Sequence, residues 1–199
     1  MTFFKIAILC YIIFYYGIIL FLRSYLLYRK TGVNSVQHLH KEGLAWFNQK
    51  VLIFCSILIS VIGLNYIFLP NNYLWLIPIS YLTTEIFRNI GLALGFFGLL
   101  FGFIAQLQMG DSWRLGENHQ EKTNLIYQGF YQYSRNPIYL FLLLAHFGYF
   151  LMLPNALSLC FLALSYVSFE IKIRLEEVYM EEKHGEEYLL FKRNVRRWI

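Results

Sequence analysis

The sequence predicts an all-α integral membrane protein with five transmembrane helices, the last two forming a helical hairpin, followed by cytoplasmic C-terminal helices. Composition places the chain in a membrane, because 58% of its 199 residues are hydrophobic, only 15% are charged and the mean hydropathy is +0.47. Soluble domains of this length are more polar. Long apolar runs give the helices, and the uneven placement of lysine and arginine gives their orientation.

Three apolar runs in the first half of the chain predict the first three transmembrane helices. They span residues 3–22, 51–69 and 90–107, and each approaches the roughly 20 residues that a helix needs to cross a bilayer. No cleavage pattern of small residues follows the first run, so we expect a retained helix and not a signal peptide. The third run carries glycines at a spacing that lets helix backbones pack closely. These are Gly91, Gly95, Gly98 and Gly102.

The fourth apolar run, residues 137–169, is too long for a single crossing. Pro154 interrupts it, and because proline lacks a backbone donor and disfavours helix at the preceding residue, the run predicts two helices joined by a tight turn. Beyond Glu170 the sequence becomes charged, which predicts that the fifth helix continues as a cytoplasmic helix capped by Gly185. A second short helix, residues 186–193, is expected to lie along the membrane surface.

Lysine and arginine gather on one side of this arrangement. Of the 17 basic residues, all except Lys5 and Arg88 lie in residues 23–50, 110–136 and 171–199. Because cytoplasmic segments carry the positive excess, the N-terminus is expected outside and the C-terminus in the cytoplasm. Orientation and attraction to anionic lipid head groups explain the net charge of +5, so no nucleic-acid partner is predicted.

The predicted helices divide the chain into two parts. Residues 1–108 hold the first three transmembrane helices and their cytoplasmic loop, residues 23–50. Residues 109–199 hold a polar loop, the hairpin and the C-terminal helices, and the candidate chemistry lies in this second part.

Two polar blocks that bracket the hairpin are the candidate site. The sequence has no nucleotide-binding loop, metalloprotease motif or nucleophile elbow, and its three cysteines show no metal-ligand spacing, so no metal site is predicted. In the first block, residues 129–139 (GFYQYSRNPIY), the guanidinium of Arg135 either binds a carboxylate bidentately or is a flanking charge. The surrounding tyrosines are either ligand-stacking rings or membrane-interface residues.

Glu176 and Glu177 characterise the second block. Acidic residues are unusual at the cytoplasmic end of a span, so this pair is either the other half of a site or a solvated helix face with ion pairs. His146 lies near the middle of the fourth span, where it either has a function or hydrogen-bonds to a neighbouring helix.

Several pieces in order resemble the isoprenylcysteine carboxyl methyltransferase and phospholipid methyltransferase superfamily. They are MGDSWR (109–114), TNLIYQGFYQYSRNPIY (123–139), KIRLEE (172–177), HGEEY (184–188) and VRRWI (195–199). The resemblance covers roughly residues 105–199, and the first three spans agree only as hydrophobic helices. It implies an integral membrane methyltransferase that binds S-adenosylmethionine on the cytoplasmic side.

The resemblance also implies roles for individual residues. Those implied to bind the cofactor are Thr123, Asn124, Leu125, Ile126, Tyr131, Asn136, Pro137, Ile138, Tyr139 and Glu177. Glu177 suits the ammonium group of the cofactor, Arg135 suits its carboxylate and the tyrosine-rich loop suits its adenine. Alignment and exclusion of water are expected to matter more than a general base. Arg135 and Glu176 are then the candidate catalytic residues, with the role of orienting the nucleophile.

The methyl acceptor is left open by departures from the superfamily pattern. Thr123 and Asn136 stand where carboxyl methyltransferases usually have histidine, and Ile173 stands where they have an arginine linked to substrate binding. A prenylcysteine-like carboxylate, a phospholipid amine and a small thiol all remain candidate acceptors. The acceptor is expected to enter from the bilayer between helices, and the RNP sequence, familiar in the bacterial and phospholipid branches, implies a bacterial inner membrane.

Two other functions stay open. A membrane reductase of related fold would bind a nicotinamide cofactor, whose extra phosphates call for more clustered basic residues than Arg114, Lys122 and Arg135. A non-enzymatic membrane assembly partner would use the polar blocks only as flanks. The sequence does not predict an oligomeric state.

Overall fold

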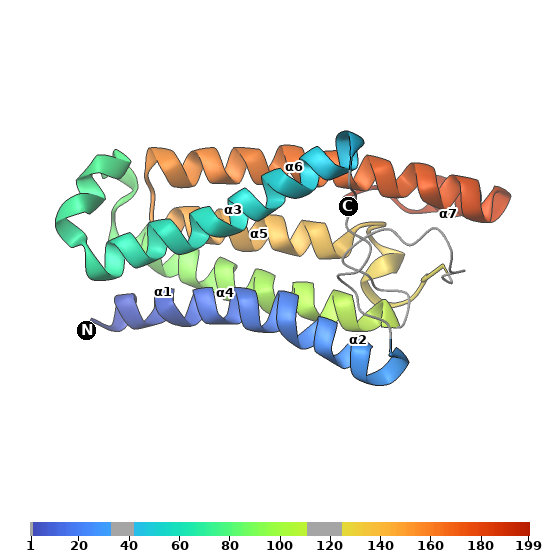
Figure 1. Ribbon diagram of the computed structural model, residues 1–199, viewed down its shortest axis with the longest axis horizontal. Helices are drawn as coiled ribbons and strands as arrows, with labels where there is room; N and C mark the ends of the chain where they lie inside the picture. Colours follow the sequence, from blue (N-terminus) through green and yellow to red (C-terminus); the bar gives the residue numbers. More distant parts are fainter. Residues whose placement is uncertain (1, 33–41, 111–124) are drawn as a thin grey trace.

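The computed structural model of the chain is all-helical and describes residues 2–32, 42–110 and 125–199. Figure 1 shows its long helices lying side by side along the longest axis of the molecule. The predicted all-α class is therefore confirmed.

The N-terminal helical run is longer than its apolar segment. Helix α1 (Phe3–Phe14), the π-helical segment η1 (Tyr15–Leu22) and helix α2 (Arg23–Thr31) follow one another without a break and form one rod in Figure 1. The run ends at Gly32, whose φ of 71° is the left-handed conformation that glycine commonly adopts after a helix. The predicted first helix, residues 3–22, lies within this run.

Helices α3 (Gly43–Phe68) and α4 (Glu85–Gln108) both begin before their apolar runs do. The first turns of α3 (GLAWFNQK) mix apolar and polar residues, and buried Asn48 donates through Nδ2 to the carbonyl of Ser168 at 3.0 Å. In α4 the hydroxyl of Thr84 caps the first turn by accepting from the backbone N–H of Phe87 at 3.4 Å. Hydropathy thus locates the long apolar part of each helix and misses the first turns, where polar residues interrupt the apolar run.

The hairpin has the predicted form. Helix α5 (Pro137–Met152) and helix α6 (Ala156–His184) are joined by a three-residue turn. Asn155 and Ser158 form a reciprocal capping box at the start of α6. The backbone N–H of Ser158 donates to Asn155 Oδ1 at 2.9 Å, and the backbone N–H of Asn155 donates to Ser158 Oγ at 3.1 Å. This box fixes the entry of α6 next to α5.

The short segments at the two ends of the molecule complete the fold. Between α3 and α4 lie the 3-10 helices η2 (Pro70–Leu76) and η3 (Ser80–Leu82). At the other end α6 stops at Gly185, which has a φ of 53°, and α7 (Glu186–Asn194) follows. The predicted glycine cap and the short helix after it are both confirmed.

Three helices, α3, α4 and α6, are long and apolar enough to cross a membrane among the residues that the structure describes. Phe3–Gly17 and α5 are shorter apolar helices. These features identify an integral membrane protein, while five crossings and the N-outside orientation stay predictions.

The backbones of α4 and α5 touch along a stripe of glycines. This pair of helices packs more extensively than any other pair of described elements. A Cβ on Gly91 would lie 2.7 Å from the carbonyl oxygen of Gly148, and one on Gly98 would lie 2.5 Å from the N of Ala145. The glycine spacing therefore forms the predicted close-packing face.

We expect Gly148→Ala to destabilise the fold. Its Cβ would meet the backbone of Gly95, which can move only if the helices separate, so the loss should be about 1–3 kcal/mol. Thermal unfolding of the detergent-purified protein measures this. Gly17→Ala is the control, because nothing lies within 4 Å of the added Cβ and alanine favours helix. An unchanged unfolding temperature for Gly148→Ala would contradict the tight contact.

Candidate functional site

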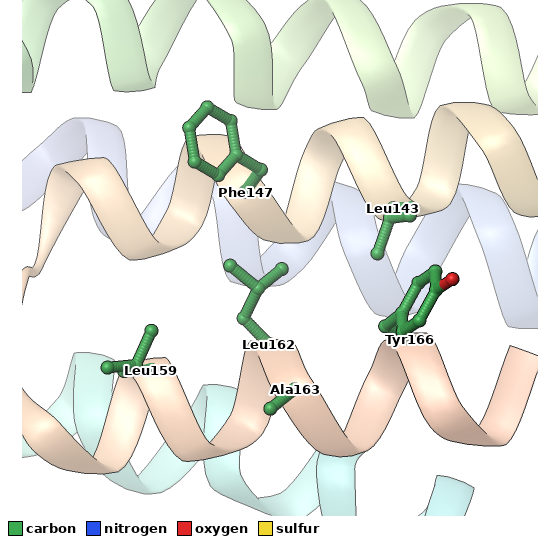
Figure 2. A pocket seen from close by; sticks show the side chains of 6 residues that line it. All are labelled: Leu143, Phe147, Leu159, Leu162, Ala163 and Tyr166. Carbon is green, nitrogen blue, oxygen red and sulfur yellow. The ribbon is translucent and has the colours of Figure 1, made fainter.

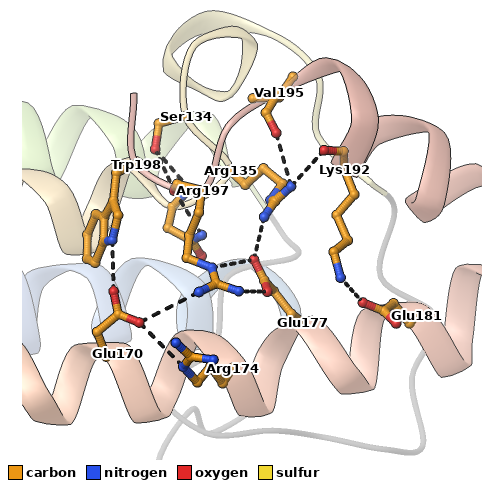
Figure 3. A network of polar contacts seen from close by, with 11 residues as sticks. Ser134, Arg135, Glu170, Arg174, Glu177, Glu181, Lys192, Val195, Arg197 and Trp198 are labelled. Carbon is orange, nitrogen blue, oxygen red and sulfur yellow. Dashed lines mark hydrogen bonds and ion pairs between the residues drawn. The ribbon is translucent and has the colours of Figure 1, made fainter.

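Polar side chains gather at one end of the helix bundle. The loop that contains the 3-10 helix η5 (Gly129–Gln132), the first turn of α5, the charged end of α6, α7 and the tail residues 195–199 all meet there. Figure 3 shows the contacts that join them. We call the following residues the polar cluster: Ser134, Arg135, Asn136, Glu170, Glu177, Arg197 and Trp198. The two polar blocks of the sequence thus lie together in space.

Glu177 is the centre of the polar cluster. Its Oε1 accepts from Arg135 Nη2 at 2.8 Å and from Arg197 Nε at 3.1 Å, and its Oε2 accepts from Arg197 Nη2 at 2.7 Å. Only 6% of its side chain and 8% of that of Arg135 are exposed. Burial raises the pKa of the Glu177 carboxyl, but the Arg197 hydrogen bond and the two positive charges outweigh burial and hold the pKa below its ordinary value. The carboxylate is therefore ionised.

Arg135 connects three segments of the chain. Besides the bond to Glu177, its Nη1 donates to the carbonyls of Lys192 and Val195 at 2.9 and 3.0 Å. These carbonyls lie at the end of α7, where a cation also meets the negative end of the helix dipole. The Nε of Arg135 has no hydrogen-bond partner in the part of the chain that the structure describes. Arg135 thus holds α7 against α6.

The tail is tied by its backbone to the start of α5. The N–H of Arg135 donates to the carbonyl of Arg196 at 3.0 Å. The carbonyl of Arg197 accepts from Ser134 Oγ at 3.3 Å and from Asn136 Nδ2 at 3.2 Å. Asn136, implied by the resemblance to bind a cofactor, therefore contacts the tail in this structure.

A second carboxylate, Glu170, lies on the same side of α6. It accepts from Trp198 Nε1 at 2.9 Å, and its Oε2 lies 3.7 Å from Arg197 Nη1 and 3.5 Å from Arg174 Nε. Arg197 is thus between two carboxylates, with its tighter contacts to Glu177.

Glu176 faces a different set of neighbours from Glu177. Its Oε1 accepts from the hydroxyl of Tyr139 at 2.7 Å and lies 3.5 Å from Lys172 Nζ, and 35% of its side chain is exposed. Of the two candidate catalytic residues, Glu176 is the more accessible, while Arg135 is buried among protein partners.

The loop before α5 is anchored on α4. Gly129 has a φ of 65°, and a Cβ there would collide with the side chain of Gln108. Gln108 Oε1 in turn accepts from the N–H of Phe130 at 2.8 Å. Tyr131 is buried, with its hydroxyl 3.4 Å from the carbonyl of Ala105.

The remaining cofactor candidates lie around this loop. Leu125, Ile126, Ile138 and Tyr139 are half-buried and Pro137 is buried. Thr123 and Asn124 lie outside the described residues.

His146 does not make the expected hydrogen bond across helices. It is buried, and both ring nitrogens lack a partner among the described residues. Its ring packs instead between those of Tyr15, Phe161 and Phe169, with centroids 5.7, 4.6 and 5.5 Å away. The apolar surroundings indicate a packing role.

Sequence reasoning missed four members of the cluster, Ser134, Glu170, Arg197 and Trp198. Glu170 had a usable signal, because it precedes Glu177 by seven residues and so shares its helix face. For Arg197 the sequence signal was only the pair of arginines in VRRWI, because an irregular tail has no periodicity that reveals its neighbours.

An apolar groove runs between α5 and α6. Figure 2 shows its side chains, Leu143, Phe147, Leu159, Leu162, Ala163 and Tyr166, and its volume is about 430 Å³. Several of these side chains are exposed at the surface. Leu143 lies one helical turn from Tyr139 and Tyr166 lies one turn from Glu170. The groove therefore begins next to the polar cluster.

Comparisons with known proteins agree with this arrangement. The sequence profile of the phospholipid methyltransferase family matches residues 81–187. The fold is similar to that of a eukaryotic intramembrane Ras methyltransferase, isoprenylcysteine carboxyl methyltransferase, with a TM-score of 0.66 and 18% sequence identity. That match covers 94% of this chain but only 62% of the other chain. No curated protein sequence matches the chain significantly.

We expect Glu177→Gln to weaken the loss of folding stability that the wild-type protein shows as the pH falls below neutral. The pKa of Glu177 is lower in the fold than in the unfolded chain, where it is about 4.3. Its stabilisation is therefore full above that pH and is lost as pH falls through the lower folded value. Near neutral pH the variant should lose about 3 kcal/mol, the low end for a broken buried ion pair, because Arg197 is partly exposed.

Unfolding temperatures in detergent, measured from about pH 4 to 8, test this expectation. Glu182→Gln makes the same chemical change at an exposed site of α6 and should stay within about 0.5 kcal/mol of wild type. Parallel pH profiles for wild type and Glu177→Gln would show that Glu177 is not the titrating group.

Proposed function

Because the chain belongs to the phospholipid methyltransferase family, we propose that it is a membrane enzyme that transfers a methyl group from S-adenosylmethionine to a lipophilic acceptor. The superfamily also includes isoprenylcysteine carboxyl methyltransferases. The observation that carries the proposal is the buried Glu177–Arg135 pair at the head of an apolar hairpin. Both residues lie within the segment that the family profile matches.

The polar cluster fits the amino-acid end of this cofactor chemically. An ammonium group needs a carboxylate that stays ionised, as Glu177 does. A carboxylate needs donors such as the guanidinium of Arg135, whose Nε has no other partner among the described residues. When bound, S-adenosylmethionine supplies an activated methyl group, and the protein supplies binding, orientation and exclusion of water.

The loop before α5 is proposed to hold the adenine end. The residues proposed for this are Leu125, Ile126, Tyr131, Asn136, Pro137, Ile138 and Tyr139, together with Thr123 and Asn124 outside the described part. Tyr131 and Pro137 are buried, so their part is to fix the loop. The half-buried Leu125, Ile126 and Ile138 offer the apolar surface that a purine ring prefers.

Glu176 is the better placed of the two candidates for orienting the acceptor. It is partly exposed and hydrogen-bonded to Tyr139, so it can receive a polar group at the end of the groove. Arg135 is less suited to orienting the acceptor, because its side chain is largely buried among protein partners. Alignment of the acceptor is then the main contribution of the protein.

The groove is proposed to hold the hydrocarbon tail of the acceptor. All six of its lining side chains are apolar or aromatic, and the groove begins one turn from Tyr139 and Glu170. A tail bound there would present its polar head to the cluster. With five crossings and the basic segments in the cytoplasm, the cluster would face the cytoplasm and the groove would open to the bilayer.

Calorimetric titration of the detergent-purified protein tests the cofactor. We expect S-adenosylhomocysteine to bind and a reduced nicotinamide dinucleotide not to bind. Glu177→Gln should weaken binding by about tenfold or more, because a charge-assisted bond is lost, whereas Glu182→Gln should not. Binding of the dinucleotide alone would overturn the assignment in favour of a reductase, and binding of neither would favour a non-enzymatic partner. Radiolabelled methyl transfer into a total lipid extract then identifies the acceptor class.

Ala163→Trp should block the groove and spare the cofactor site. The indole would occupy space where an acyl or prenyl chain lies, so the KM for a lipid acceptor should rise about tenfold or more while affinity for S-adenosylhomocysteine stays unchanged. Val167→Trp places the same side chain at an exposed position of α6 outside the groove and is the control. Equal effects of the two variants on KM would argue against the groove.

A further inference from the structure

Arg197 occupies the place that the proposed function assigns to the ammonium group of the cofactor. Its Nε and Nη2 bind the two oxygens of Glu177, and Arg135 takes a further position on Oε1. A carboxylate has about four acceptor positions, so three donors leave little capacity for another cation. A ligand can reach Glu177 fully only where Arg197 gives way.

Of the two arginines, Arg197 is the one that can move. Its side chain is 29% exposed, against 8% for Arg135. Arg135 is also held by two carbonyls at the end of α7, whereas the guanidinium of Arg197 contacts two carboxylates, Glu177 and Glu170, among the described residues. Displacing the Arg197 side chain therefore leaves the described contacts at the end of α7 in place.

Glu170 provides a second place for the displaced guanidinium. It precedes Glu177 by two helical turns, about 10 Å along the axis of α6, and already lies 3.7 Å from Arg197 Nη1. The backbone carbonyl of Arg197 is held by Ser134 and Asn136, and Trp198 is bonded to Glu170. The side chain can thus move between the carboxylates while the tail stays docked.

We propose that Arg197 is an internal latch that pairs with Glu177 when no cofactor is bound and moves fully onto Glu170 when the cofactor's ammonium group takes its place. This inference rests on the proposed function. It makes Arg197 a competitor of the cofactor, and it makes Glu170 a positioning residue that affects cofactor binding by receiving the displaced arginine.

The latch predicts opposite effects for its two members. Arg197→Gln removes the competitor and leaves Glu177 paired with Arg135, so the binding-competent fraction rises and S-adenosylhomocysteine should bind about tenfold tighter. Glu170→Gln removes the receiving carboxylate, so binding should be about threefold to tenfold weaker. The double variant should bind like Arg197→Gln, because no arginine remains to be received.

Calorimetric titration of S-adenosylhomocysteine into wild type and these three variants, with unfolding temperatures as a check on folding, measures the effects. Arg196→Gln is the matched control, because the neighbouring Arg196 is exposed. It contacts the cluster through its backbone carbonyl, which the substitution keeps. Should Arg197→Gln not fold, Arg197→Lys keeps the cation, loses the two-point contact and should tighten binding about twofold to threefold.

The outcomes separate the two proposals. If wild type binds S-adenosylhomocysteine but Arg197→Gln binds equally or more weakly, the latch is wrong and the proposed function stands. A double variant weaker than Arg197→Gln would show that Glu170 acts independently of the arginine, which also overturns the latch. If neither wild type nor Arg197→Gln binds, the proposed function fails and the latch fails with it.

Discussion

One buried carboxylate organises the polar end of this protein. Burying an ionised group costs several kcal/mol unless it is paired, and Glu177 is paired on both oxygens by arginines from two distant segments. Arg135 brings the start of α5 and the end of α7 to α6, and Arg197 brings the tail. The contacts of the candidate site also hold this end of the bundle together.

A second constraint acts on the apolar side, where α4 and α5 touch through glycines. Without hydrophobic attraction between helices in lipid, such close backbone contact supplies the packing energy. It also sets where the loop before α5 lies, because Gln108 at the end of α4 holds the N–H of Phe130. The glycine stripe and the loop contacts together place the first turn of α5 within reach of Glu177.

The sequence predicted the helices well because hydropathy and the positions of proline and glycine are local signals. The turn at Pro154 and the cap at Gly185 were both found in this way. Helix starts were missed where polar residues such as Asn48 interrupt the apolar run although the backbone stays helical. The meeting of Arg135 and Glu177 was expected from the hairpin and is confirmed by their contact, whereas the roles of these residues in binding and catalysis stay predictions. Arg197 was not found, because an irregular tail has no pattern that shows its partners.

The order of these residues along the chain has a consequence for how the protein is made. Arg135 and Glu177 are 42 residues apart, and Arg197 follows Glu177 by a further 20 residues. A ribosome needs about one to four seconds to synthesise those 20 residues. Arg135 and Glu177 are therefore both synthesised before Arg197. The pair that joins α5 to α6 thus precedes the tail in the chain, and the tail can dock only after both segments that hold it have been made.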